Sequence, residues 1–328
     1  MFWLKLLSGS IILTTLLTVS KGCADNKRIP NEVFAISEEP YLDWCSQPVS
    51  PKPHSGGRLR IATWNLENLH AEDGESTFTG SRPSVTRNAS DYERIQCYIQ
   101  FVDPDVLAVQ EVDGEEALRR VVDSNIYDVH VSQRQSGTLN GRQNTGFAFK
   151  RSLEVEIQPD FKELDTSGRL RFGSRISLSH QGRTIQMMSV HLKSGCFDES
   201  FDNSACKHLA DQVKVLEDWI DKAASGPDPF IILGDFNRRF NIPGDTMWSE
   251  LDDGDPPNAD LECITAGMPI NCRDNRYTEF IDHILLDRRA AAWIERTSFR
   301  HVTFRQQDRN VWDKISTHCP VVVDLWIE

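Results

Sequence analysis

The stretch ILGDFNRR, residues 232–239, decides how the rest of the chain is interpreted. An apolar run ends at Gly234, and an acid, an aromatic residue, an amide and two arginines follow at once. Asp235 and Asn237 are two positions apart, so an extended backbone would place both side chains on one face. Two interpretations compete. Either these polar residues cap a turn, or the end of a buried strand presents a carboxylate and an amide to a phosphate.

The composition indicates a globular protein that is acidic overall. Of 328 residues, 39% are hydrophobic and 26% are charged, which is enough apolar mass for a sizeable core. The formal net charge of −13 argues against a broad basic surface for nucleic acid. A nucleic acid or another phosphate substrate would have to be held by local cations, such as Arg238 and Arg239, or by a bound metal.

The N-terminus resembles an export signal. Lys5 precedes an apolar run over residues 11–19, and small residues follow at 22–24, where a signal peptidase prefers them. The run is short for a permanent membrane anchor. We therefore expect residues 1–24 to be a cleaved signal peptide, with no stable membrane insertion after processing. A lipoprotein signal, with lipid attached at Cys23, is the alternative.

Residues 25–57 are polar and rich in proline and glycine, which is typical of a linker or N-terminal extension. The folded domain is expected over residues 58–328. Apolar residues at helical spacing predict helices over 91–102 and 206–225. The predicted strands are 58–66, 105–112, 127–133, 145–150, 153–158, 175–180, 184–192, 229–235, 280–287, 299–304 and 319–327.

The order of these elements predicts the fold class. Little helix separates the strands between residues 127 and 192, so these strands should pair as antiparallel hairpins. The chain has two separate sets of apolar strands, mixed with helices. This favours two packed sheets with the helices outside. We predict an α/β (α+β) fold: a four-layered sandwich of two mostly antiparallel β-sheets flanked by helices.

Of the eight cysteines, Cys23 falls in the signal region. Export would give the other seven a role, because disulfides form readily outside the cytoplasm. Each of the two local pairs would close a polar loop, and a third pair is a further candidate. The predicted pairs are Cys196 with Cys206, Cys263 with Cys272, and Cys45 with Cys97. Cys319 then remains within an apolar run and is expected to be a buried free thiol. No Cys-x-x-Cys pair occurs, which disfavours a zinc site.

Six of the apolar runs are followed or interrupted by polar residues that can bind a metal or transfer a proton. These residues are Asn65, Glu111, His191, Asp235 with Asn237, Asp282, and His318. Each one alone is more simply explained as a cap, a turn residue or a satisfied core histidine. Strand ends at one edge of a sandwich converge, however, so together they predict one site. Oxygen ligands without sulfur favour a hard cation, and nearby histidines suit the stabilisation of a developing charge.

The same segments resemble the endonuclease/exonuclease/phosphatase family, which includes pancreatic-type deoxyribonucleases. The matching segments, in family order, are TWNLEN (63–68), LAVQEV (107–112), SVHLKS (189–194), LGDFN (233–237), IDHILL (281–286) and STHCPV (316–321). This resemblance covers residues 58–328. Together with the export signal, it implies an exported, monomeric phosphodiesterase that depends on a divalent metal and acts on nucleic acid as an endonuclease. The implied cofactor is magnesium, with manganese or calcium as alternatives.

The resemblance also implies a role for each residue of the metal and water site. Asn65 and Glu111 would bind the metal, Glu111 directly. Asp235 would orient and deprotonate the attacking water, and Asn237 would hold the scissile phosphate. These residue types suit the reaction, because a phosphodiester repels hydroxide and its charge must be neutralised while water is held in line.

The histidines have roles by the same resemblance. His191 would contact the phosphate and assist departure of the leaving oxygen. His318, oriented by Asp282, would stabilise the charged transition state, since a neighbouring carboxylate keeps an imidazole protonated. The family usually has Ser-Asp-His where this chain has Ser-Thr-His. Thr317 carries no charge, which implies weakened or altered use of the metal.

Four further residues have open interpretations. Lys193 and Arg238 are candidate contacts to substrate phosphates, or ordinary surface charges. Asn144 either binds substrate over the site or belongs to a hairpin turn. Glu67 either joins the metal site or forms hydrogen bonds within a turn.

Two other functions fit the same residues. The substrate could be a phosphomonoester or a lipid headgroup, although the phosphatase branch usually has Trp-Cys-Asp-Arg where this chain has FIDHILL (280–286). The chain could also be a weakly active or non-catalytic relative that binds phosphate ligands, an interpretation that rests on Thr317.

Overall fold

The computed structural model describes residues 56–75, 85–134, 143–196, 203–240, 242–256, 259–268, 270, 272 and 279–328. The predicted signal peptide and the extension up to residue 55 lie outside these ranges, so the predictions made for them stay predictions. Among the helices within these ranges, none has the length and apolarity needed to cross a bilayer.

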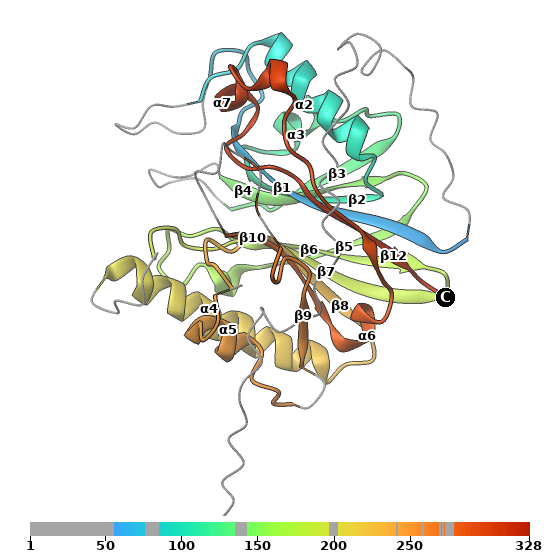
Figure 1. Ribbon diagram of the computed structural model, residues 1–328, viewed down its shortest axis with the longest axis vertical. Coiled ribbons are helices and arrows are strands. Elements are labelled where there is room, and N and C mark those ends of the chain that lie inside the picture. Colours follow the sequence, from blue (N-terminus) through green and yellow to red (C-terminus); the bar gives the residue numbers. More distant parts are fainter. Residues whose placement is uncertain are drawn as a thin grey trace, which may run out of the picture.

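Two six-stranded sheets pack face to face at the centre of the molecule (Figure 1). The first sheet has the order β11 (Ile294–His301), β12 (Val321–Trp326), β1 (Arg58–Leu69), β2 (Val106–Val112), β4 (Asn144–Lys150) and β3 (Tyr127–Val131). The second sheet has the order β5 (Glu154–Phe161), β6 (Gly173–His180), β7 (Arg183–His191), β8 (Phe230–Asp235), β10 (Asp282–Asp287) and β9 (Leu261–Cys263).

Helices cover the outer face of each sheet (Figure 1). The first sheet is covered by α2 (Ala89–Val102), α3 (Glu115–Arg119) and α7 (Trp312–Ile315). The second is covered by α4 (Ser204–Ala224) and α5 (Thr246–Leu251), and α6 (Arg288–Ala291) follows β10. Short 3-10 turns occur at Lys162–Leu164 and Gln306–Asp308. The predicted four-layered sandwich is therefore confirmed.

Three apolar clusters hold the layers together. Alternation along β1 directs Ile61 into the cluster between the sheets and Trp64 into the cluster under α2. Below the second sheet, α4 buries its stripe of Leu209, Val213 and Leu216. Full burial of each such side chain stabilises the fold by about 1.5–3 kcal/mol relative to exposure.

Strand direction explains why the polar residues gather at one edge. In each sheet, two consecutive strands run parallel, β1 with β2 and β7 with β8, while the other described pairs are antiparallel. The carboxyl ends of each parallel pair therefore lie at the same edge. In the second sheet, His191 is opposite Asp235, and Asp235 is opposite Asp282.

Some expected elements differ in the structure. The last predicted strand before β12 was 299–304, but β11 spans Ile294–His301, and its first half is only partly buried. No pattern in the sequence predicts α3, α5 or β9, which are three to six residues long. Elements this short have too few residues to show a periodic pattern.

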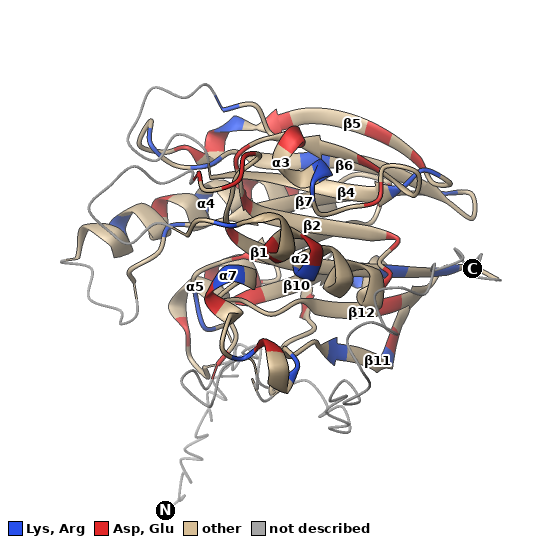
Figure 2. Cartoon of the chain, turned by 90° about the horizontal axis from the view of Figure 1, so that it is seen from above, with Lys and Arg blue, Asp and Glu red and all other residues tan. Residues whose placement is uncertain are grey.

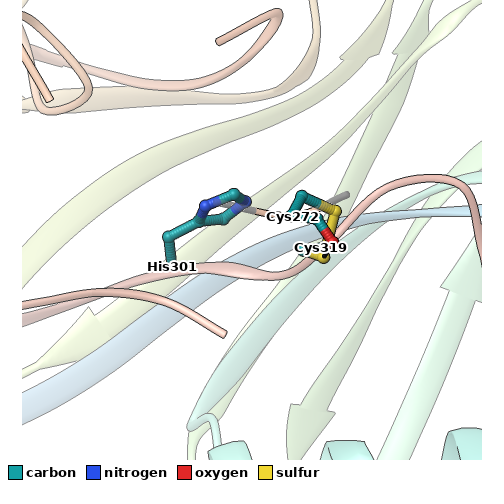
Figure 3. Close-up of side chains that lie close together, drawn as sticks. All are labelled: Cys272, His301 and Cys319. Carbon is teal, nitrogen blue, oxygen red and sulfur yellow. Dashed lines mark hydrogen bonds between the residues drawn. A yellow bond between two sulfur atoms is a disulfide. The ribbon is translucent and has the colours of Figure 1, made fainter. Parts of the chain in front are cut away.

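The disulfides confirm one prediction and contradict two. Cys196 and Cys206 are bonded as predicted. The predicted Cys263–Cys272 pair is wrong, because Cys272 bonds to Cys319, 47 residues away in sequence (Figure 3). Cys319 is accordingly not a free thiol. The short separation in sequence suggested the Cys263–Cys272 pair. The fold instead brings the loop before β10 against the start of β12.

The remaining cysteine predictions involve residues of which the structure describes only some. Cys263 is disulfide-bonded, and so is Cys97. Cys45, the predicted partner of Cys97, lies outside the described residues. Figure 3 shows His301 beside the bonded pair of Cys272 and Cys319. Since both sulfurs belong to a disulfide, neither is a thiolate that could bind a metal.

Candidate active site

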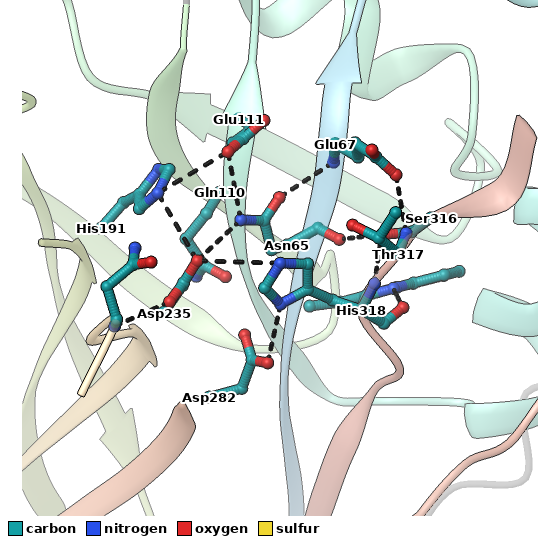
Figure 4. A network of polar contacts seen from close by, with 12 residues as sticks. Asn65, Glu67, Gln110, Glu111, His191, Asp235, Asp282, Ser316, Thr317 and His318 are labelled. Carbon is teal, nitrogen blue, oxygen red and sulfur yellow. Dashed lines mark hydrogen bonds and ion pairs between the residues drawn. The ribbon is translucent and has the colours of Figure 1, made fainter. Parts of the chain in front are cut away.

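A single cluster of polar side chains lies where the two sheets meet at this edge (Figure 4). The first sheet contributes side chains from the ends of β1 and β2, and the second contributes them from β7, β8 and β10. The segment before β12 completes the cluster. The members contributed by these elements are Asn65, Glu67, Glu111, His191, Asp235, Asp282, Ser316, Thr317 and His318.

Asp235 lies at the centre of the cluster and is only 2% exposed. Its Oδ2 atom accepts a hydrogen bond from Asn65 Nδ2 at 3.0 Å, and its Oδ1 atom accepts one from the Asn237 backbone at 2.8 Å. Burial, aided by the charge of Asp282, raises the pKa of Asp235 to about 7. A carboxyl that titrates near neutrality is suited to act as a general base.

His318 is held by Asp282. The His318 Nδ1 atom lies 2.8 Å from Asp282 Oδ2, and His318 Nε2 lies 3.9 Å from Asp235 Oδ2. Burial alone would lower the pKa of His318, but the charge and hydrogen bond of Asp282 outweigh it and raise the pKa to about 10. The imidazole is therefore cationic at neutral pH and can stabilise negative charge.

His191 has the opposite electrostatic state. Burial, together with the nearby charges of Arg171 and His318, lowers the pKa of His191 well below its ordinary value. Its Nε2 atom lies 3.0 Å from Arg171 Nη2 and 3.5 Å from Asp235 Oδ2. The imidazole is neutral, so the positive charge at this end of the cluster belongs to Arg171.

Two further residues of the cluster, Arg171 and Gln143, are not marked by any pattern in the sequence. Gln143 Nε2 donates to Glu111 Oε2 at 3.0 Å, and Gln143 Oε1 accepts from Arg171 Nη2 at 3.3 Å. Both residues come from connections between strands, where no apolar periodicity marks a position. The segment GRQNTG drew attention to Asn144, but the neighbouring Gln143 is the residue that contacts Glu111.

Two carboxylates at the ends of β1 and β2 form a candidate metal site. Glu67 and Glu111 both have positive φ, +44° and +59°, a region that non-glycine residues seldom adopt. Burial raises the pKa of Glu67, and the charge of Glu111 raises it further. Two carboxylates that repel each other fit a hard divalent cation.

Asn65 forms hydrogen bonds with the Glu67 backbone and with two carboxylates of the cluster. Its Oδ1 atom accepts the Glu67 backbone N–H at 2.9 Å, and its Nδ2 atom faces Asp235 and Glu111. The amide therefore presents its donor group to both carboxylates. Its predicted role as a metal ligand stays a prediction.

The segment that carries His318 is fastened to the end of β1. Ser316 Oγ donates to Asn65 O at 2.6 Å, and the Thr317 backbone N–H donates to Glu67 Oε2 at 2.7 Å. Arg87 Nη2 donates to the carbonyl oxygens of Leu66 and Ile315. This buried guanidinium, which the sequence did not reveal as important, fixes the two segments against each other.

Of the residues predicted to contact substrate, only Asn237 lies beside Asp235. Asn237, at φ +52°, donates to Leu192 O at 3.2 Å beside Asp235. Arg238 is buried against Asp245 at 2.6 Å, Asn144 donates to Asp113 O, and Lys193 Nζ donates to Ser194 O. These last three contacts lie outside the cluster around Asp235, and the substrate-binding roles stay predictions.

A cavity of about 240 Å³ opens beside the His318–Asp282 pair. Its lining includes Asn237, Arg239, Asp282, Thr317 and His318. Arg239 is partly exposed, and its Nε atom lies 3.8 Å from Glu279. The cluster thus combines a base, a cationic imidazole and room for a ligand.

Comparison with known proteins defines the class. The model of the Endonuclease/Exonuclease/phosphatase family matches residues 62–298, and the chain belongs to this family. No curated protein sequence matches the chain significantly.

Solved structures share the fold at low sequence identity. Truncated TDP2 from Caenorhabditis elegans is 14% identical, with a TM-score of 0.55, over 82% of this chain and 98% of that one. The catalytic domain of human Nocturnin with bound sulfate is 16% identical, with a TM-score of 0.54, over 82% and 94%. An AP endonuclease from Archaeoglobus fulgidus is 14% identical, with a TM-score of 0.52, over 82% and 100%.

Proposed function

We propose that the protein is an exported, divalent-metal-dependent phosphodiesterase that hydrolyses nucleic acid as an endonuclease. The observation that carries this proposal is the convergence of Asp235, the His318–Asp282 pair and the two glutamates in one cluster. A base, a fixed cationic acid and a hard-cation site together match the needs of in-line attack on a phosphodiester.

In this proposal, Asp235 takes the proton from the attacking water. Its Oδ1 atom is fixed by the Asn237 backbone and its Oδ2 atom by Asn65, so the carboxylate has one orientation. Asn237, at the edge of the cavity, is placed to donate its side-chain amide to a phosphate oxygen after releasing Leu192 O. Because water and phosphate would both be held in fixed positions, their reaction would become effectively unimolecular.

Positive charge from the protein supports the transition state from two sides. His318 supplies an imidazolium whose orientation is set by Asp282. Arg171 supplies a guanidinium next to the neutral His191. In this arrangement, His191 positions Arg171 through Nε2, and the Arg171 guanidinium is the donor available to the leaving oxygen.

Glu111 and Glu67 would hold the metal, with Mg²⁺ as the expected ion and Mn²⁺ or Ca²⁺ as alternatives. When bound, a divalent cation would neutralise phosphate charge and favour ionisation of water. Thr317 lies next to this site but offers its backbone N–H to Glu67, so no additional carboxylate assists there.

A nucleic-acid substrate is favoured by the class of protein. One solved relative, TDP2 from D. rerio, is described in complex with a single-strand DNA product and is 18% identical, with a TM-score of 0.53. In the view of Figure 2, the described Lys and Arg residues are interspersed with Asp and Glu. Local groups such as Arg239 would therefore hold the backbone phosphates.

Export and a monomeric state are part of the proposal. The bonded pairs Cys196–Cys206 and Cys272–Cys319 support an oxidising compartment. Fractionation of the host cells would test export. Light scattering of the purified protein would test the monomer.

The decisive experiment measures hydrolysis of plasmid DNA, RNA and a chromogenic phosphodiester with Mg²⁺ and with EDTA. We expect nicking of the plasmid that EDTA abolishes and that added metal restores. The Asp235→Ala variant is the control for a contaminating nuclease. Turnover of inositol phosphates or sphingomyelin without any cleavage of nucleic acid would instead favour the phosphomonoesterase or lipid-headgroup alternative.

The weakly active or binding-only alternative has one specific observation in its favour, the uncharged Thr317. Calorimetry with an oligonucleotide would show binding in that case, while every substrate above stayed intact. Metal-dependent turnover of any of them would exclude a binding-only protein, and a turnover that Thr317→Asp does not increase would exclude a weakly active one.

A further inference from the structure

A cavity of about 530 Å³ lies on the outer face of the second sheet, beside helix α4. Its volume is within the range of roughly 300–1,000 Å³ that is typical of small-molecule sites. The strands β5, β6 and β7 contribute Phe161, Arg175 and Gln186 to its lining, and α4 contributes Trp219 and Lys222. The catalytic proposal gives this cavity no role.

The cavity is separate from the candidate active site. Along β7, Gln186 lies on the same face of the sheet as Met188, which packs in the apolar cluster under α4. His191 is an odd number of residues from Gln186, so its side chain points to the opposite face. The two residues are also roughly 16 Å apart along the strand, at about 3.3 Å per residue. One small ligand therefore cannot occupy both places.

Two aromatic rings give the cavity an aromatic wall. The ring centroids of Phe161 and Trp219 are 6.4 Å apart, and both residues are partly exposed. The buried Phe230 packs edge-on against Trp219, at 5.3 Å between centroids, and fixes the orientation of the indole. An indole that is held in place on one side and open on the other is a suitable surface on which a flat ring can stack.

Arg175 adds a positive charge that no described acid pairs with. Its guanidinium lies near Trp219, with Cζ 5.9 Å from the ring centroid. Within the described part of the chain, the side chain forms neither a hydrogen bond nor an ion pair. Burial lowers the pKa of Arg175, and the charge of Glu163 offsets this effect only in part. A guanidinium has five N–H donors, and here they remain available to an anion.

The other charged residues of the cavity are more exposed than Arg175. Glu163, Asp218 and Lys222 are exposed, whereas Arg175 is partly buried. Exposed charges are hydrated and screened by salt, so the partly buried guanidinium has the stronger effect on a bound ion. The two acids can instead accept hydrogen bonds from hydroxyl or amino groups of a ligand.

We propose that this cavity binds a nucleoside monophosphate. The base stacks on Trp219, the phosphate accepts hydrogen bonds from Arg175, and the sugar hydroxyls donate to Glu163 or Asp218. Such a ligand combines the flat ring that the aromatic wall suits with the anion that Arg175 lacks. A contact between a guanidinium and a phosphate is among the strong hydrogen-bonded pairs. The site goes beyond the proposed hydrolysis and shares no residue with the cluster around Asp235.

Calorimetric titration of the purified protein with AMP and with adenosine, both in EDTA, tests the site. We expect AMP to bind the wild type at least about tenfold more tightly than adenosine, as for the gain of a charged hydrogen bond. Arg175→Met should abolish this preference and leave the binding of adenosine unchanged. Arg183→Met removes an exposed guanidinium from the start of β7, and this matched control should keep the preference.

The aromatic contact is tested separately. Trp219→Leu should weaken the binding of both ligands by about tenfold, as for the loss of base stacking, whereas Trp219→Phe should retain part of it. His318→Gln changes the candidate active site and should bind AMP as the wild type does. Equal AMP affinity in Arg175→Met and in the wild type would overturn the site. So would loss of AMP binding in His318→Gln, or a wild type that does not bind AMP at millimolar concentration.

Discussion

His318 Nδ1 lies 2.8 Å from Asp282 Oδ2, and this contact sets the charge of the imidazole. It raises the pKa of His318 to about 10, so the ring stays protonated from neutral pH up to that value. A group whose folded-state pKa is raised in this way also stabilises the fold at low and neutral pH, and the effect disappears as pH approaches 10.

We expect Asp282→Asn to lower the pKa of His318. The alkaline limb of the pH–rate profile should then move to lower pH, and kcat at pH 8 should fall by about 10²-fold or more. Asp260→Asn removes an exposed acid and is the control. An unchanged alkaline limb in Asp282→Asn would assign that limb to another group.

Asp235→Asn should abolish catalysis while it stabilises the fold. Burial raises the pKa of Asp235 to about 7, so the acid limb of the wild-type profile should fall near that pH. The neutral amide removes the burial penalty of the charged form, and above pH 7 we expect a gain on the order of 1 kcal/mol. Activity should fall by about 10²–10⁴-fold. Loss of activity together with a lower Tm would indicate a structural role instead.

Arg171→Met should raise the pKa of His191, because the variant removes a positive charge that lies 3.0 Å from the ring. NMR titration of the imidazole measures the change directly. We also expect kcat to fall by about 10²-fold, as for loss of one charged donor to the transition state. Arg151→Met, directly after β4, removes an exposed guanidinium and serves as a control. If the pKa of His191 stays the same in this variant, Arg171 does not control the charge of the imidazole.

Thr317→Asp should increase metal-dependent turnover. The new carboxylate would stand one residue before His318 and beside Glu67, and added negative charge strengthens binding of a divalent cation. We expect the metal concentration at half-maximal activity to fall by about tenfold. Thr317→Asn has nearly the same size without the charge, and should behave as the wild type. Equal gains in both variants would exclude the charge as the cause.

The Cys272–Cys319 disulfide should matter more for catalysis than its contribution to stability suggests. Replacing both cysteines with serine should reduce stability by about 2–4 kcal/mol and also lower kcat, because Cys319 directly follows His318. The matched control replaces Cys196 and Cys206, whose disulfide is not adjacent to His318. If both variants lose stability and activity in the same proportion, the Cys272–Cys319 disulfide has no specific effect on His318.

The sequence predicted the layers of the fold because buried strands and α4 have long, regular apolar patterns. It also predicted which side chains would gather, since residues such as Asp235 and Asp282 interrupt those patterns at strand ends. The parallel pairing of β1 with β2 and of β7 with β8 brings both sets to one edge.

The sequence did not predict contacts that depend on three-dimensional proximity alone. Arg87 and Arg171 lie in connections, where a single basic residue gives no pattern. Cys272 and Cys319 are far apart in the chain, and the spacing of eight cysteines does not determine their pairing. Asn144 attracted attention through its turn-like segment, but the adjacent Gln143 makes the contact with Glu111.

The left-handed backbone at Glu67, Glu111 and Asn237 has a consequence for evolution and engineering. Each of these residues holds a conformation that glycine would adopt with less strain. Glycine would relieve this strain but would remove groups that hold the site together, such as the Glu67 carboxylate that accepts the Thr317 backbone N–H. The strained backbone at these positions is therefore kept for the groups that it presents.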